Sequence, residues 1–198
     1  MIAPLAVAPG DYLAADAVID HTHPALLAKA AELRSAAGEV ATARATFDFV
    51  LEQLPHSRDL GDWSAAYVAS DVLAEGNAIC HGKAHLFAAL LRANGIPAGL
   101  CYQRLADDVP GGFVVHGLNA VLLEGRWVRL DARGGTPGAA ARFSTDPADE
   151  HPAFPVDPAL DEVDYPTVHP TTPPALLKGL QAAEPNRTGY GYYLPDAV

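Results

Sequence analysis

The chain has 198 residues, of which 49% are hydrophobic, and it carries a formal net charge of -11 at pH 7. A chain of this length and composition can bury the core of one domain and still carry a longer appended segment. The negative charge argues against nucleic acid and anionic membrane surfaces as partners, because both are negatively charged themselves. No run of about 18 apolar residues is present, and the first ten residues contain neither Lys nor Arg. We therefore expect no membrane anchor and no signal peptide, and we expect a cytoplasmic protein.

Helix-forming patterns occupy much of the first half of the chain. We expect residues 1–23 to form an irregular or extended arm. Good helix formers after an initial proline predict a helix over 24–33, and apolar residues recur with helical spacing over 40–54. A polar loop over 56–62 and a short helix over 64–74 are expected next.

The middle of the chain predicts one long helix followed by an antiparallel meander. The helix covers residues 80–94, and its broad apolar surface indicates that it runs through the core. Three β-type segments follow at 100–104, 113–123 and 127–131, and the connection over 124–126 is short enough for a tight hairpin. This order predicts an α+β fold, with N-terminal helices packed on an antiparallel sheet.

The composition changes after residue 135. Residues 136–198 contain eleven of the seventeen prolines, and within them only residues 174–180 could form a short helix. Such a stretch cannot build a core of its own, so it is either a tail or a segment that wraps the preceding domain. Its aromatic residues are Phe143, Phe154, Tyr165, Tyr190, Tyr192 and Tyr193. A solvated tail gains nothing from these rings, so we expect a domain over 1–135, with its core at 40–133, wrapped by residues 136–198.

A cysteine, a histidine and an aspartate occupy positions that suit a nucleophile, its base and the group that orients the base. Cys80 begins the long helix, where unpaired N–H groups favour the thiolate by at most about one pKa unit. His116 lies in an apolar strand, and Asp131 ends the next strand, so the hairpin can bring them side by side. His116 would lower the pKa of the thiol further, and Asp131 would hold the imidazole.

The same residues permit other interpretations. Taken singly, Cys80 could be an inert core thiol, His116 a core histidine and Asp131 a turn residue. Cys80, His81 and His85 could ligate a metal, since the two histidines lie four residues apart on a helix. No second cluster supplies further ligands, so we expect no metal site.

Further residues near the thiol are candidates for the substrate site. Asn77 could donate a hydrogen bond to an oxyanion or cap the helix, and capping is the role we favour. His81 suits the edge of a cleft, and Trp63 suits a cleft wall or the core. Two cysteines cannot form a disulfide framework, so Cys80 and Cys101 are expected to be free thiols. Cys101 lies in the first predicted strand, where we expect it to be buried and inert.

Two blocks of the sequence resemble the transglutaminase-like superfamily, in particular its bacterial members described as cysteine proteases. The first block runs from ASDVLAEG at 69–76 through Cys80 to ALLRANGIPA at 89–98. The second joins Val115-His116 to GRWVRLD at 125–131. The resemblance implies a papain-like α+β fold, a catalytic triad of Cys80, His116 and Asp131, and no obligatory cofactor.

The chain departs from the family pattern at two positions. Ala78 stands where family members commonly have glycine, and Leu118 stands where they often have an aromatic residue. We therefore expect both to line the substrate site, together with Asn77, His81 and Trp63.

The triad and the resemblance together imply a cysteine-dependent acyl-transfer enzyme. Cys80 would attack a peptide, isopeptide or glutamine-type amide of a peptide or protein, and His116 would act as base and then as acid. We favour hydrolysis over transamidation, because the chain is small and shows no calcium-binding loop or amine site. The alternative is a non-catalytic module that holds a peptide or a partner protein in the same cleft. The oligomeric state stays open.

Overall fold

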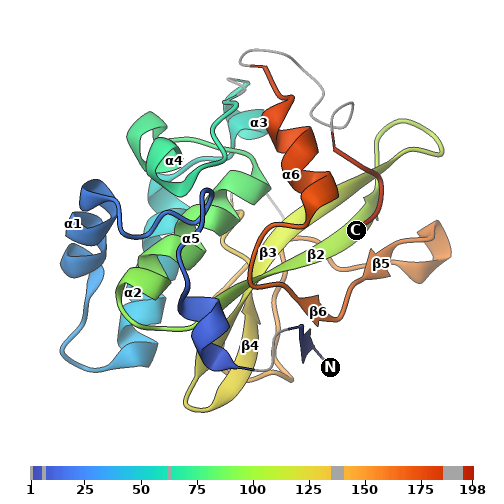
Figure 1. Ribbon diagram of the computed structural model, residues 1–198. Coiled ribbons are helices and arrows are strands. Elements are labelled where there is room, and N and C mark those ends of the chain that lie inside the picture. Colours follow the sequence, from blue (N-terminus) through green and yellow to red (C-terminus); the bar gives the residue numbers. More distant parts are fainter. Residues whose placement is uncertain (1, 6–7, 62–63, 135–140, 185–193) are drawn as a thin grey trace.

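Helix α5 (Cys80–Ala93) lies between a layer of helices and a β-sheet in the computed structural model (Figure 1). The structure describes residues 2–5, 8–61, 64–134, 141–184 and 194–198. Helices α1 (Pro24–Leu33), α2 (Glu39–Gln53) and α4 (Ala69–Glu75) pack on α5 from the side away from the sheet. The mixed helix and strand architecture confirms the predicted α+β fold. Among the described residues, no helix has the length and apolar character needed to cross a bilayer.

The sheet is antiparallel throughout and has the strand order β4-β3-β2-β5. Strands β2 (Ala98–Ala106), β3 (Phe113–Leu123) and β4 (Arg126–Leu130) form the predicted meander, and β2 is longer than predicted at both ends. Glu124 and Gly125 make the two-residue hairpin turn with φ values of 49° and 76°. Such turns require the left-handed region at both positions, which glycine adopts without strain.

The region before α5 differs from the sequence prediction. Helix α3 (Ser57–Leu60) lies within the expected polar loop, because the His56 ring accepts a backbone N–H of its first turn. Helix α4 begins at Ala69 rather than at residue 64, and its N-cap residue supplies no side-chain hydrogen bond. A distant side chain accepts an N–H of its first turn instead. Asp20 Oδ1 accepts the N–H of Ser70 at 3.1 Å. Sequence periodicity carries no sign of a cap supplied from fifty residues away.

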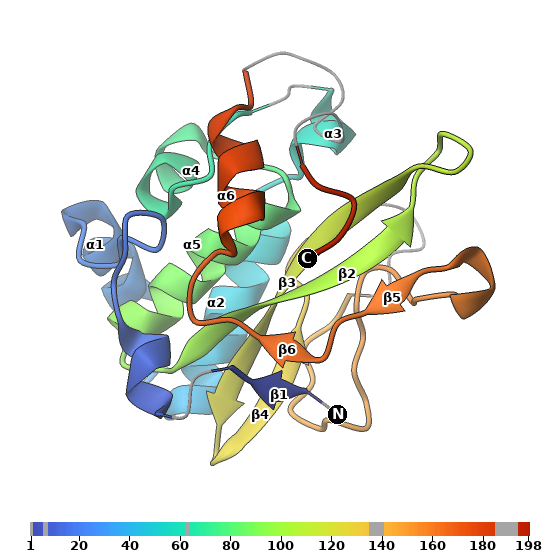
Figure 2. The same ribbon diagram turned by 45° about the vertical axis from the view of Figure 1, so that its right-hand side comes forward.

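The C-terminal segment contacts the rest of the chain along the outer edge of β2 (Figure 2). After the 3-10 helix η2 (Pro158–Leu160), β5 (Val163–Asp164) pairs with β2, and β6 (Thr167–Val168) pairs in parallel with β1 (Ala3–Pro4). Helix α6 (Pro174–Gln181) adds one buried leucine to the main core and packs another against Ile79, the residue before Cys80. Three of the aromatic residues considered above, Tyr190, Tyr192 and Tyr193, lie outside the described residues.

Two clusters of apolar residues pack on the sheet. The main core joins α1, α2, α4 and α5 to residues of β2, β3 and β4. The smaller cluster contains Tyr12 of the 3-10 helix η1 (Pro9–Leu13), together with Cys101, Leu118 and Val168. Burial raises the pKa of Cys101 to about 12, so this thiol is inert at neutral pH, as expected from the sequence.

Gly99 of β2 allows the smaller cluster to pack closely, which gives a stability prediction. A Cβ atom at this position would lie 2.4 Å from Val168 Cγ1 and 2.9 Å from Tyr12 Cε1. We expect Gly99→Ala to lower the free energy of unfolding by about 1–3 kcal/mol, because packed neighbours must move. Urea unfolding measures the change, and Gly10→Ala is the matched control, since a Cβ there meets nothing within 4 Å. Equal stabilities of the two variants would contradict this packing.

Candidate active site

Cys80 is the first residue of α5, and it is partly exposed. The loop before it is fastened to the start of α3. The N–H of Ser57 donates to the Ala78 carbonyl at 3.0 Å, and the Ser57 hydroxyl donates to the Asn77 side-chain oxygen at 2.7 Å. Asn77 therefore does not cap α5, whose N-cap residue is Ile79. The expected capping role was wrong, because the Asn77 oxygen is engaged by a hydroxyl from another element.

The hairpin of β3 and β4 places His116 beside Asp131. Asn119 pairs with Leu130 in this hairpin. Asp131 follows directly after β4, so it lies opposite the part of β3 next to His116. His116 Nε2 lies 2.8 Å from Asp131 Oδ2, and both side chains are buried. The two residues form a hydrogen-bonded pair closed off from solvent.

Asp131 accepts two further hydrogen bonds, both from backbone N–H groups. Its Oδ2 accepts the N–H of Ala153 at 2.7 Å, and its Oδ1 accepts the N–H of Arg133 at 3.0 Å. Burial acts to raise the pKa of Asp131, but His116 and these N–H groups outweigh it and hold the pKa below its ordinary value. Burial likewise acts to lower the pKa of His116, whereas Asp131 and Cys80 raise it to about 10. At neutral pH the pair is an imidazolium and a carboxylate.

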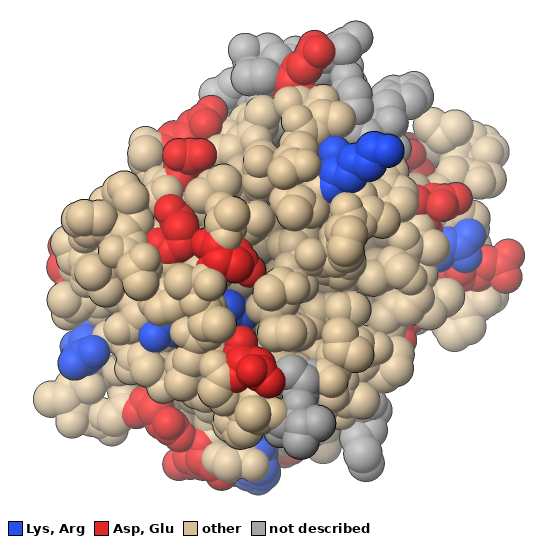
Figure 3. Space-filling model, viewed as in Figure 1, with Lys and Arg blue, Asp and Glu red and all other residues tan. Residues whose placement is uncertain are grey.

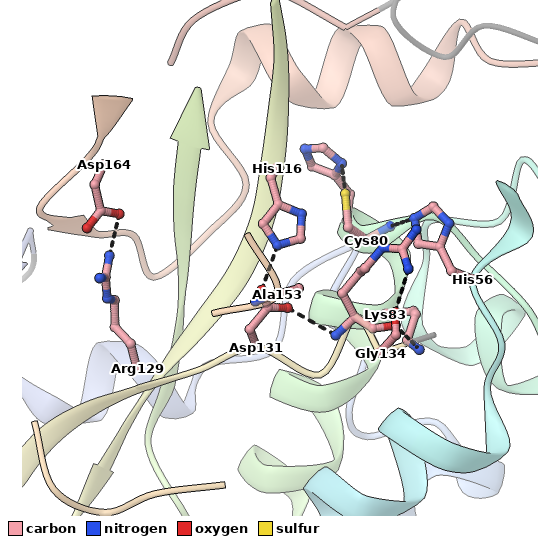
Figure 4. Close-up of polar contacts among 11 residues, drawn as sticks. His56, Cys80, Lys83, His116, Arg129, Asp131, Gly134, Ala153 and Asp164 are labelled. Atoms are coloured by element: carbon pink, nitrogen blue, oxygen red, sulfur yellow. Dashed lines mark hydrogen bonds and ion pairs between the residues drawn. The ribbon is translucent and has the colours of Figure 1, made fainter. Parts of the chain in front are cut away.

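The thiol of Cys80 faces the other side of the His116 ring. Figure 4 shows His116 between Cys80 and Asp131, with one ring nitrogen directed toward each. Burial acts to raise the pKa of the thiol, but the electrostatic effect of His81 and the side-chain interactions with His116, His56 and His81 lower it well below its ordinary value. The site therefore favours the thiolate at neutral pH.

His56 was not identified from the sequence, although it contacts the backbone of Cys80. The N–H of Cys80 donates to His56 Nε2 at 3.0 Å, and the N–H of Arg58 donates to His56 Nδ1 at 3.2 Å. A neutral imidazole has one lone pair for such a bond, so only one of these N–H groups can be accepted at a time. Burial is the largest influence on His56 and lowers its pKa. Nothing in the expected polar loop distinguished this histidine from an ordinary solvated one.

Lys83 was also not identified from the sequence, although its hydrogen bonds connect segments around the site. It lies one turn after Cys80 (Figure 4) and is buried, and its Nζ donates to the backbone carbonyls of Leu54 and Arg133. Burial lowers the pKa of Lys83 to about 7. The side chain of Arg133 in turn holds Asp59 of α3 through two bonds of 2.8 and 3.0 Å. Together these contacts tie α3 and α5 to the loop that carries Asp131.

The residues expected to line the substrate site are mostly buried. His81 lies against Tyr102 and Gly117, and Ala78 packs beside Gly82, where an added Cβ would lie 2.8 Å from the Ala78 Cβ. Leu118 is buried in the smaller core cluster. Trp63 lies outside the described residues. Asn77, Ala78 and His81 adjoin Cys80 in the chain, whereas Leu118 packs in the core.

His85 does not join Cys80 and His81 as a metal ligand. Its Nδ1 donates to the Tyr67 carbonyl at 2.7 Å, and its Nε2 accepts from the Thr172 hydroxyl at 3.0 Å, so both nitrogens are engaged. The described residues contain no group of three or more His, Cys, Asp or Glu side chains that could hold a metal ion. His85 instead links α5 to the C-terminal segment.

The burial of His85 predicts an acid-sensitive contribution to stability. Burial is the largest influence on His85 and lowers its pKa to about 4, whereas the unfolded chain takes up this proton near pH 6.5. Relative to His85→Asn, we expect the wild type to lose up to about 3 kcal/mol of unfolding free energy as the pH falls from about 7 to about 4. Urea unfolding at stepped pH measures this difference. Parallel pH curves for the two proteins would contradict a neutral, buried His85.

A sequence model of the transglutaminase-like superfamily matches residues 28–132, which is more than half of the chain. This range contains Cys80, His116 and Asp131. A comparison with curated proteins finds no match.

Solved structures resemble this chain at low sequence identity. A candidate cysteine protease from Cytophaga hutchinsonii matches with a TM-score of 0.53 and 21% identity, over 65% of this chain and 43% of that one. A candidate protease from Parabacteroides distasonis gives a TM-score of 0.43 and 14% identity, over 64% and 30% of the two chains. A transglutaminase (TGase) gives 0.39 and 22%, over 65% and 35%. This chain thus spans less than half of each of these proteins. On the match of its core, the chain belongs to the transglutaminase-like superfamily.

Proposed function

We propose that the chain is a cysteine-dependent acyl-transfer enzyme that hydrolyses a peptide, isopeptide or glutamine-type amide. One observation carries this proposal: Cys80, His116 and Asp131 form a line of contacts in which the imidazole lies between the sulfur and the buried carboxylate. A lowered thiol pKa beside a raised histidine pKa is what a nucleophilic thiolate and its general acid require.

The first half of the proposed reaction forms a thioester. The Cys80 thiolate attacks the carbonyl carbon, a C–S bond forms, and an electron pair moves to the carbonyl oxygen. The N–H of Cys80 can donate to this oxyanion once it is released from His56 Nε2, its acceptor at rest. His116 then gives its Nδ1 proton to the leaving nitrogen. The oxyanion electron pair re-forms the carbonyl, and the C–N bond breaks with its electron pair on nitrogen.

The second half returns the site to its starting state. The now neutral His116 takes a proton from water, and the hydroxide attacks the thioester carbonyl. The C–S bond breaks and its electron pair returns to sulfur, which regenerates the thiolate beside an imidazolium. Asp131 stays ionised throughout, because it accepts hydrogen bonds from two backbone N–H groups as well as from His116.

A peptide or protein is the proposed partner. The face shown in Figure 3 carries basic side chains only as separate spots among acidic and uncharged ones, and the chain as a whole is acidic. This distribution offers little attraction to a phosphate backbone. Water is the proposed acceptor of the acyl group, although the same thioester chemistry would also serve an amine.

We further propose that residues 136–198 belong to the same structural unit as the triad. Ala153 donates its N–H to Asp131, and the Phe154 ring meets the His116 ring edge-on at a centroid distance of 5.2 Å. Strand β5 also extends the sheet that carries His116. The segment therefore contacts both the imidazole and its carboxylate.

The pH dependence of alkylation tests the activated thiol. We expect iodoacetamide to modify Cys80 with a midpoint well below pH 8.5 in the wild type, and His116→Ala to raise that midpoint, because the thiolate loses a charged donor. Mass spectrometry assigns the site, and buried Cys101 serves as an internal control that stays unmodified. An unshifted midpoint that ignores His116 would favour the non-catalytic module.

Products distinguish hydrolysis, transamidation and mere binding. We expect wild type incubated with glutamine-containing peptides and a primary amine to yield hydrolysed peptides rather than amine adducts, and Cys80→Ala to yield neither. Mass spectrometry of the mixture identifies the products. Tight peptide binding by both proteins without turnover would overturn the enzymatic proposal.

Removal of the charge at Asp131 tests the role of the carboxylate. We expect Asp131→Asn to slow amide hydrolysis by about 10²–10⁴-fold, because an amide cannot accept from His116, Ala153 and Arg133 together and cannot stabilise the imidazolium. The alkaline limit of activity should also fall, since Asp131 is the largest influence that raises the pKa of His116.

The chain supplies a matched control for this substitution. Asp149 Oδ1 lies 2.8 Å from His151 Nε2, the same kind of pair on the C-terminal segment. Asp149→Asn should leave the rate and its pH limit unchanged, and equal losses in the two variants would contradict a specific role for Asp131.

A further inference from the structure

A second imidazole, that of His81, contacts the proposed nucleophile. His81 Nδ1 lies 3.4 Å from Cys80 Sγ, within the range of a hydrogen bond to sulfur. His81 follows Cys80 directly on α5, but its side chain is 1% exposed, which makes it a poor surface for substrate. His81 takes no part in the reaction steps proposed above.

The His81 ring is held in place by its neighbours. It stacks on the Tyr102 ring of β2, with a centroid distance of 6.1 Å and an interplanar angle of 28°. The backbone of β3 lies against it at Gly117, where an added Cβ would be 3.3 Å from His81 Cδ2. A ring confined by a strand and an aromatic ring cannot readily turn its Nδ1 away from the sulfur.

The two nitrogens of this ring differ in their contacts. His81 Nε2 is buried, and it has no hydrogen-bond partner among the described residues. His81 Nδ1 faces the sulfur, and a nitrogen that bonds to a thiolate must carry the proton. The ring therefore presents an N–H to Cys80 at Nδ1. His116 differs, because its far nitrogen is paired with Asp131.

We propose that His81 is a second catalytic residue, a fixed donor whose Nδ1–H stabilises the Cys80 thiolate while His116 alone carries the proton. This inference rests on the acyl-transfer function proposed above. His81 donates to the sulfur when it is the nucleophile and again when it is the leaving group. In the second case the C–S bond breaks, its electron pair goes to sulfur, and the His81 proton stays on nitrogen.

Other ionisable groups also act on this sulfur, so the contribution of His81 must be separated from theirs. His116 approaches from β3 with Asp131 behind it, and His56 approaches from the loop before α3. Lys83 and His85 on α5 and Tyr102 on β2 are further groups coupled electrostatically to Cys80. None of these groups is removed by a substitution at position 81, so differences between variants at that position report His81.

The test is the midpoint of Cys80 alkylation in five proteins: wild type, His81→Leu, His81→Asn, His116→Ala and the double variant His81→Leu/His116→Ala. We expect His81→Leu to raise the midpoint by about one to two pH units, since a donor to an anion is lost. His81→Asn should lie near the wild type, because its amide can place an N–H close to the Nδ1 position. The double variant should titrate above either single variant.

A second readout follows the acyl-enzyme. Wild type and His81→Leu are mixed with p-nitrophenyl acetate, and the acetylated Cys80 species is followed by intact mass. We expect the thioester to persist longer in His81→Leu, because the departing thiolate lacks its donor. In His81→Asn the rate of thioester hydrolysis should return toward that of the wild type, which a purely structural role of His81 would not produce.

His169→Leu is the matched control for these measurements. This histidine also packs on the Tyr102 ring, at 5.6 Å between centroids, but it lies on the C-terminal segment and not beside the sulfur. Its profile should coincide with that of the wild type. Thermal unfolding of each variant shows that the fold is retained.

Two outcomes overturn the inference while sparing the proposed function. One is a His81→Leu profile that coincides with the wild type while His116→Ala shifts. The other is a shift of equal size in His81→Leu and His81→Asn, which would make the effect one of packing. A wild-type midpoint at about 8.5 would instead contradict the activated thiol itself.

Discussion

The burial of helix α5 is the constraint on which the rest of the site depends. Every residue from His81 to Arg92 is buried, including two cations near its two ends. Lys83 donates to carbonyls of the α2 end and the loop after β4, and Arg92 donates to the carbonyls of Ala14, Ala98 and Pro170. Buried cations need such partners, and these partners come from segments far apart in the chain. The helix that presents Cys80 is therefore fixed at both ends by the chain that surrounds it.

The carboxylate of Asp131 joins three parts of the molecule at one point. It accepts from β3 through His116, from its own loop through Arg133, and from the C-terminal segment through Ala153. Each donor favours the ionised carboxylate, and the ionised carboxylate favours the charged imidazole. The charge state of the imidazole thus depends on a residue 22 positions after Asp131 in the chain, which gives the proline-rich part of the chain a physical reason to be ordered there.

Local patterns predicted those parts of the fold that are determined by neighbouring residues. Apolar periodicity located α5, and the short turn at Glu124 and Gly125 set the register that puts His116 beside Asp131. Contacts between distant segments escaped such patterns. Asp20 sets the start of α4, and His56 reaches Cys80 from a predicted loop, although neither has a sequence neighbour that signals its partner. Asn77 was assigned to the cap of α5 for the same reason, since Ser57 was not visible as its partner.

Three of the histidines on or beside α5 show why residue type alone cannot assign a role. Each has one nitrogen near a functional or structural group, and the contacts of its other nitrogen differ. Asp131 holds His116 as a cation, whereas the Tyr67 carbonyl and the Thr172 hydroxyl hold His85 as a neutral link. His81 has no described partner at its far nitrogen, and its Nδ1 lies beside the Cys80 sulfur. Under the proposed function, a proton carrier, a structural link and a fixed donor arise from one residue type, because in a buried setting the contacts of both nitrogens matter.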